Sequence, residues 1–159
     1  MKKSFLHKPL IILLSVLFIA NACKKDESYT QVSEFERGIH NALNDYRASL
    51  GKDPMVLQFL LMNDAKTFSA KMANETEAFS TDWFMPELEN QKVLLAADSS
   101  AAWVAYCEYE EPDSVMSIVL NNPDIRTKIE GYFNQNAVGT AKDINGNYYI
   151  TGLMLHFKK

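Results

Sequence analysis

Cysteine is scarce in this chain, which has only Cys23 and Cys107 among its 159 residues. Cys23 ends an N-terminal segment with the composition of a leader, so Cys107 is the only thiol of the domain that follows. A single thiol cannot form an internal disulfide, and the domain therefore depends on packing for its stability. Histidine is almost as scarce, with three in the whole chain, which leaves few candidates for acid–base chemistry or metal binding.

A long apolar run is also missing. The run from Leu10 to Ala20 falls short of the roughly 18 residues that a membrane-spanning helix needs. It follows Lys2, Lys3 and Lys8 and precedes small residues, which is the order found in secretory signals. Because it ends at Cys23, the segment resembles a bacterial lipoprotein signal, in which that cysteine becomes the lipid-modified first residue.

We therefore expect residues 1–22 to be a signal peptide and residues 23–32 to be a lipidated polar tether. The segment Lys24 to Glu27 resembles a short signal that sends some lipoproteins to the outer face of the outer membrane, although a solvated tether explains the same residues. The expected location is the bacterial outer membrane, with the chain held by its lipid. Whether it faces the cell surface or the periplasm stays open at this point.

Clusters of basic residues are absent as well. Removing residues 1–22 takes away three lysines and no acid, so 16 minus 3 leaves 13 basic against 20 acidic side chains, a net charge of about −7. A chain this acidic repels phosphate backbones, and nucleic acid is not an expected partner. The remaining length of about 125 residues suits one domain, which we place at residues 33–159.

Apolar periodicity predicts how this domain is organised. Ser33 and Glu36 have the spacing of a capping box, and a helix is expected from there to Gly51. A second helix is expected on the apolar stripe from Leu57 to Met72. Asn145-Gly146 is a strong hairpin signal between two strands. The remaining expected elements are helices over 87–97, 112–122 and 124–130 and strands over 103–109, 137–142 and 148–157.

Four stretches in this order share a pattern with one known family. They are Leu43 to Gly51, Ala78 to Ser80, Asn122 to Arg126, and the final hairpin from Phe133 to Thr151. Together they resemble the CAP superfamily, also called SCP, which includes cysteine-rich secretory and plant pathogenesis-related proteins. The resemblance covers roughly residues 33 to 157. It implies an α/β fold, a three-layer α/β/α sandwich around a small, mainly antiparallel sheet.

The departures from that family concern its metal site. Members that bind metal gather two histidines and acidic residues in a central cleft, a set that suits Zn²⁺. The resemblance puts Thr81 and Ile125 at the two histidine positions and Ala102 at a glutamate position. We therefore expect no metal and no cofactor, with Glu108 left open as a substitute acid. His40 is expected at a boundary or on the surface, and Cys107 as a packed thiol.

The loop from Phe79 to Met85 carries an aromatic cluster, at a place where the family has a loop beside its cleft. If its rings are exposed they form a binding surface, and if they are buried they fill the space that metal ligands occupy elsewhere. We expect a ligand cleft formed by Phe79, Thr81, Trp83, Phe84, Ala102 and Ile125. The predicted function is a non-catalytic binding module for a hydrophobic ligand or an envelope protein. The alternatives are a hydrolase using a carboxylate pair with raised pKa values, and a purely structural envelope protein.

The lipid anchor can be tested at its attachment atom. A single acyl chain binds membranes only marginally, whereas two or more chains hold a protein stably. We expect Cys23→Ser to move the protein from the membrane fraction to the soluble fraction in detergent partitioning, while Cys107→Ala leaves its distribution unchanged. Unchanged partitioning of the Cys23 variant would contradict the lipoprotein interpretation.

Overall fold

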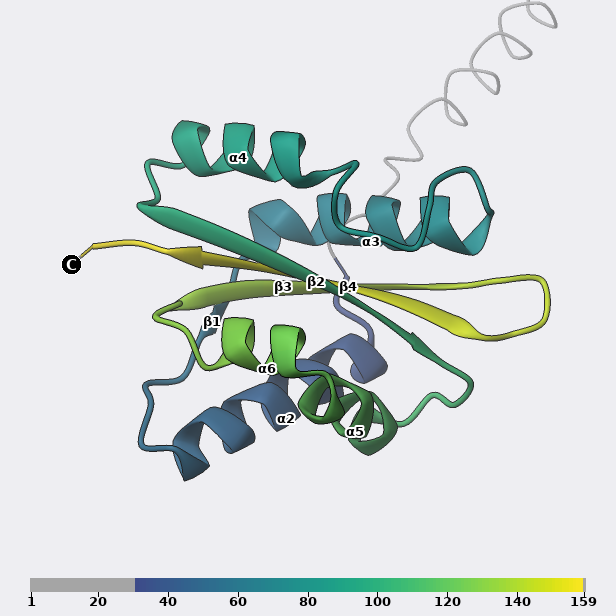
Figure 1. Cartoon of the computed structure of the whole chain (residues 1–159), viewed down its shortest axis with the longest axis horizontal. Helices are drawn as coiled ribbons and strands as arrows, with labels where there is room; N and C mark the ends of the chain where they lie inside the picture. Colours follow the sequence, from purple (N-terminus) through teal and green to yellow (C-terminus); the bar gives the residue numbers. More distant parts are fainter. Residues whose placement is uncertain (1–30, 159) are drawn as a thin grey trace, which may run out of the picture.

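The computed structural model describes residues 31–158 as a sheet between two helical layers (Figure 1). The expected signal peptide, the lipidated Cys23 and most of the tether lie outside the described residues. Within residues 31–158, no helix has the length and apolarity to cross a bilayer. The α/β/α sandwich predicted from the sequence is confirmed.

The sheet has four strands in the order β1-β3-β4-β2. Strands β3 and β4 form an antiparallel hairpin, β2 runs antiparallel to β4, and β1 adds a short parallel edge to β3. The sheet is therefore mainly antiparallel, as predicted. The strands are β1 (Val56–Leu57), β2 (Ser99–Cys107), β3 (Gln135–Lys142) and β4 (Tyr148–His156).

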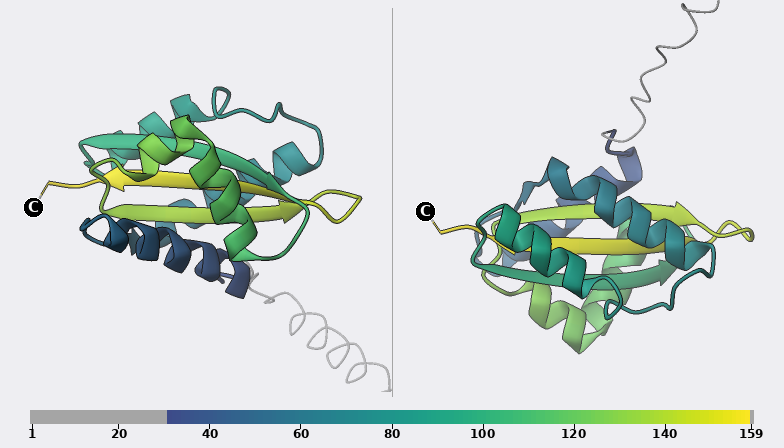
Figure 2. Two further views of the ribbon diagram at one scale, coloured as in Figure 1. Left: turned by 60° about the horizontal axis from the view of Figure 1, so that its bottom comes forward. Right: turned by 90° about the horizontal axis from the view of Figure 1, so that it is seen from above.

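The helices divide between the two faces of the sheet (Figure 2). One face carries α2 (Glu34–Ser49), α5 (Pro112–Asn121) and α6 (Pro123–Ile129), and the other carries α3 (Phe59–Ala73) and α4 (Met85–Leu94). Each face has its own apolar core, because alternate residues of a strand point to opposite sides. These two cores supply the packing that a chain without an internal disulfide requires.

Two local signals in the sequence are confirmed. The Ser33 hydroxyl accepts a hydrogen bond from the Glu36 N–H at 3.1 Å, and the Glu36 carboxylate accepts one from the Ser33 N–H at 2.9 Å, which completes a capping box. In the hairpin, Gly146 has φ +88°, a conformation that glycine adopts without strain. The Asp143 carboxylate accepts the backbone N–H groups of Asn145 and Asn147 and closes that turn.

The expected start of the second helix is wrong. Leu57 belongs to β1, and the helix begins at Phe59 with Gln58 as its N-cap. The reason is long-range pairing, since the N–H groups of Val56 and Gln58 donate to the carbonyls of Asn134 and Asn136 at 2.9 and 2.7 Å. The strand expected from Trp103 likewise begins earlier, at Ser99, because β2 pairs with the whole length of β4.

Arg47 is buried although it is charged. Its guanidinium donates to four backbone carbonyls at 2.6 to 3.2 Å, and these belong to Asp53, Ile129, Gly131 and Phe133. The Arg47 side chain therefore ties the loop after α2 to the segment between α6 and β3. A planar fork of donors suits this arrangement better than an ammonium group does.

Replacing the Arg47 guanidinium by an ammonium group should destabilise the domain. We expect Arg47→Lys to lower the free energy of unfolding by about 3 kcal/mol, because lysine leaves buried carbonyls without donors. Arg37→Lys, on the exposed face of the same helix, is the control and should change it by less than about 0.5 kcal/mol. Urea unfolding measures both. Equal effects would show that the buried carbonyl contacts are not what stabilises the fold.

Candidate functional site

The structure does not gather the six expected cleft residues in one place. Phe84 and Ala102 are buried in the core under α3 and α4, whereas Ile125 is buried in the core on the other face of the sheet. Thr81 is half-buried in the loop that leads into α4. Ile125 and Ala102 are thus separated by the sheet itself and cannot line a common cleft.

The alternation of β2 explains this separation. Ala102 and Val104 face the α3 and α4 layer, whereas Ala101 and Trp103 face the α2, α5 and α6 layer. Trp103 therefore shares a core with Ile125 and is fully buried there. Its ring lies against Gly152, where a Cβ atom would approach it to 2.0 Å. A large apolar side chain thus occupies the interior next to Ile125.

The aromatic loop is divided between packing and exposure. Phe68 of α3 stacks on Phe84 with ring centroids 4.5 Å apart, and Trp83 meets both rings edge-on at 5.4 and 5.0 Å. The Trp83 indole N–H donates to the Ala78 carbonyl at 3.0 Å and so holds the loop against the helix. Trp83 and Phe84 are therefore packing residues. Phe79, in contrast, is 51% exposed.

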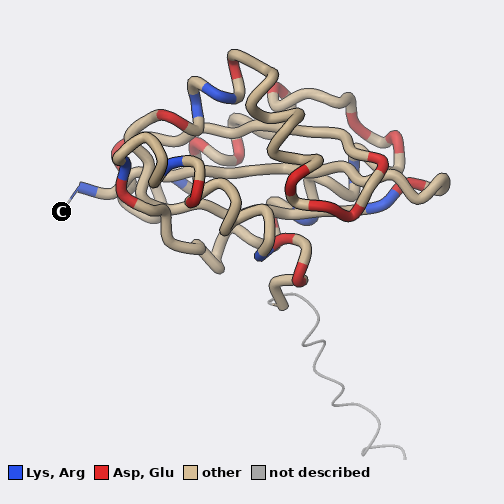
Figure 3. The backbone as a smooth tube through the Cα atoms, turned by 90° about the horizontal axis from the view of Figure 1, so that it is seen from below, with Lys and Arg blue, Asp and Glu red and all other residues tan. Residues whose placement is uncertain are grey.

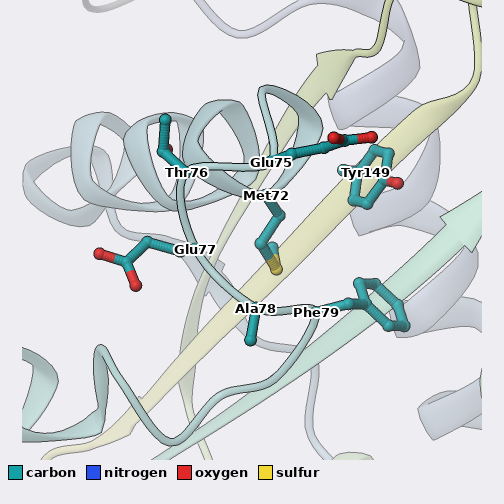
Figure 4. A pocket seen from close by; sticks show the side chains of 7 residues that line it. All are labelled: Met72, Glu75, Thr76, Glu77, Ala78, Phe79 and Tyr149. Atoms are coloured by element: carbon teal, nitrogen blue, oxygen red, sulfur yellow. The ribbon is translucent and has the colours of Figure 1, made fainter.

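A pocket of about 390 Å³ lies beside Phe79, where α3 ends and the chain crosses the sheet (Figure 4). The Phe79 ring meets the Tyr149 ring edge-on at 5.8 Å, and Tyr149 in turn meets Tyr106 at 5.3 Å. Tyr106 and Tyr149 are direct partners across β2 and β4. The pocket is lined by Met72, Glu75, Thr76, Glu77, Ala78, Phe79 and Tyr149.

Backbone hydrogen bonds hold the mouth of this pocket. The N–H and hydroxyl of Thr76 both donate to the Lys71 carbonyl, at 3.0 and 2.9 Å. Glu75 has φ +57°, the left-handed region that residues with a side chain rarely adopt. This turn carries the chain from the end of α3 across to Phe79. The loop is therefore shaped before anything binds to it.

Acidic groups surround the pocket and the neighbouring rings. Glu75 and Glu77 are exposed, and neither takes part in the ion pairs formed among residues 31–158. Burial, together with the negative charges of Asp143 and Glu108, raises the pKa of the Tyr106 hydroxyl. Figure 3 shows acidic residues near the end of the molecule that carries the β3–β4 hairpin. Glu108, left open as a cleft acid, is exposed at this end.

Among residues 31–158, no three His, Cys, Asp or Glu side chains lie close enough together to hold a metal ion. The carboxylate with a raised pKa is Asp64 on α3, where burial and the charge of Glu87 on α4 favour the protonated form. Neither of these two residues lines the pocket.

His40, which was expected at a boundary or on the surface, lies between α2 and β3. His40 is buried, and its Nδ1 donates to the Asn136 Oδ1 at 2.7 Å while its Nε2 accepts from Asn44 at 3.2 Å. Burial lowers the pKa of His40, so the neutral ring links α2 to β3. Cys107 is buried as expected, and its thiol donates to the Tyr109 carbonyl. Neither side chain lines the pocket.

Comparison with known proteins gives matches in structure only. No family model matches the sequence, and no curated protein matches it. An outer surface protein of Borrelia burgdorferi aligns with a TM-score of 0.67 at 15% identity, over 80% of this chain and 96% of that one. A venom allergen-like protein of Schistosoma mansoni aligns with a TM-score of 0.58 at 16% identity, over 80% of this chain and 92% of that one.

A third match is an extracellular protein of Bacillus anthracis that contains an SCP domain. It has a TM-score of 0.59 and 16% identity, over 77% of this chain and 40% of that longer chain. At such low sequence identity, these matches show the fold and do not show a shared activity. The chain has the fold of CAP, or SCP, domains, as the sequence motifs implied.

Trp83 provides a test of which aromatic residues support the loop. We expect Trp83→Ala to lower the free energy of unfolding by about 2 to 3 kcal/mol, somewhat less than a fully buried tryptophan. Phe79→Ala removes an exposed ring from the same loop and should cost less than about 1 kcal/mol. Denaturant unfolding compares the two. A Trp83→Ala variant as stable as the parent would contradict its assignment as a packing residue.

The expectation that the domain binds no Zn²⁺ in its interior can be tested by melting. A ligand that binds only the native state at one hundred times its dissociation constant adds about 2.7 kcal/mol of stability. We expect saturating Zn²⁺ to leave the melting temperature of the chelator-treated protein unchanged. A rise in melting temperature that disappears when residues around Thr81 are substituted would contradict this expectation.

Proposed function

We propose that the chain is a lipid-anchored protein of the bacterial outer membrane whose CAP-like domain faces the surface as a non-catalytic binding module. The anchor is supported by the leader that ends at Cys23, and the surface location by the Lys24 to Glu27 segment. A match that is itself described as an outer surface protein, and that has the same fold, supports this location further.

The observation that carries the binding role is the pocket beside Phe79. It has a volume of about 390 Å³ and is bordered by the exposed Phe79 ring and the half-buried Tyr149 ring. Burying such rings contributes roughly 25 cal/mol per Å² without any titrating group. The pocket therefore suits an apolar group of a small ligand or of an envelope protein's side chain.

The pocket differs from the cleft expected from the sequence, although Phe79 belongs to both. Ile125 lies in the same buried core as Trp103, so binding there would require repacking of that core. The pocket requires no such change, because the Phe79 ring is already exposed and the loop is held by backbone hydrogen bonds. For this reason we assign the binding role to the pocket.

A neutral apolar probe tests this role. The full chain, labelled with 3-fluorotyrosine and held in maltoside micelles, is titrated with cyclohexanol and followed by ¹⁹F NMR. We expect a saturable shift of the Tyr149 resonance and no shift of the Tyr132 resonance, since Tyr132 is 88% exposed and lies outside the pocket. Tyr149→Phe and Tyr132→Phe assign the two signals.

Two outcomes decide whether the binding role stands. A Tyr149 resonance that does not move, or that moves only in parallel with Tyr132, would contradict the binding role and favour a purely structural envelope protein. A shift that is lost in Phe79→Ala and kept in Tyr132→Ala would place the probe in the pocket.

A further inference from the structure

We propose that the pocket binds an organic cation, with a methylated or otherwise alkylated ammonium group placed against the rings of Phe79 and Tyr149. This inference rests on the proposed function, because it names the class of ligand for the same pocket. It is carried by the combination of aromatic faces and free carboxylates in one small site.

The aromatic part of the site has the geometry that such a cation needs. The rings of Phe79 and Tyr149 lie nearly perpendicular to each other with centroids 5.8 Å apart, and both residues line the pocket. A quaternary ammonium group is attracted to a ring face within about 6 Å of its centroid. Buried Met72 supplies a polarizable thioether at the centre of the lining, as Figure 4 shows.

The charged residues of the lining favour a ligand with a positive charge. The lining contains two carboxylates, those of Glu75 and Glu77, and no basic residue. In Figure 4 the Glu75 side chain extends toward the Tyr149 ring, whereas the Glu77 side chain points away from the rings. Glu75 is therefore placed to face a bound cation. Glu77 would attract the same cation only weakly, because its carboxylate points away from the rings.

Neither Lys71 nor Lys142 lines the pocket. Lys71 lies over the Trp83 ring at 5.1 Å from its centroid, and Lys142 pairs with Glu110 at 3.4 Å. The charges of Asp143 and Glu108 act on Tyr106, whose ring contacts Tyr149 of the lining. An anionic ligand would meet this field unfavourably, and a neutral apolar ligand would leave it unused.

Choline and its uncharged analogue 3,3-dimethyl-1-butanol separate charge from shape. Each is titrated calorimetrically into the full chain in maltoside micelles, with sodium chloride held constant. We expect choline to bind about tenfold more tightly than the alcohol, with about fivefold from one nearby carboxylate charge and about twofold from a cation–π contribution at an exposed site. Phe79→Ala, which removes an exposed ring, should reduce this advantage about twofold.

Two matched variants test the carboxylate. Glu75→Gln should weaken choline binding about fivefold, as expected when one charge near contact distance in water is removed, and should leave binding of the alcohol unchanged. Glu77→Gln makes the same change in net charge and should weaken choline binding by less than about twofold. Circular dichroism of each variant verifies the fold.

The outcomes distinguish a failure of the cation inference from a failure of the binding role. If the alcohol binds as tightly as choline, or if Glu75→Gln has no effect, the cation inference is overturned while the pocket remains an apolar binding site. If choline produces no heat but cyclohexanol still shifts Tyr149, the same conclusion holds. If none of the three probes binds, both the inference and the binding role are overturned.

Discussion

The fold depends first on the full set of hydrogen bonds around the buried Arg47 guanidinium. Burial lowers the pKa of this group, but its ordinary value is so high that it keeps its charge and must find acceptors. It finds them in the carbonyls of Asp53, Ile129, Gly131 and Phe133. Because these carbonyls flank β1 and β3, one side chain determines where both strands enter the sheet. The parallel pairing of β1 with β3 follows from that placement.

The position of β3 in turn determines the position of α3, and hence of the pocket. At Gly139 an added Cβ would lie 2.2 Å from the backbone of Ala65, so only glycine permits this approach of helix and strand. The Ser69 hydroxyl lies 2.9 Å from both the Gly139 carbonyl and the Thr151 hydroxyl. These contacts set the register of α3 over the sheet. The C-terminal end of α3, which leads into the pocket loop, therefore lies beside Tyr149 of β4.

Features with local causes could be predicted from the sequence, and features with distant causes could not. The capping box at Ser33 and the Asn145-Gly146 turn each depend on a few neighbouring residues, and both are present. The burial of His40 depends on Asn136, 96 positions away. The expected cleft failed to assemble for a simpler reason, because a strand residue such as Ala102 changes faces when an alignment shifts by one position. No sequence pattern marked Tyr149 as a neighbour of Phe79.

Aromatic side chains have two different surroundings in this domain, the buried cores and the pocket beside Phe79. Trp103 and Phe84 are almost fully buried, and they fill the two cores on opposite faces of the sheet. A core without voids leaves no room for a ligand and is costly to open. The pocket beside Phe79 lies outside both cores, and the Phe79 ring there contacts Tyr149 but stays exposed. A cation bound there, as we propose, would meet the aromatic rings and the carboxylates of Glu75 and Glu77 together, and both would favour its positive charge.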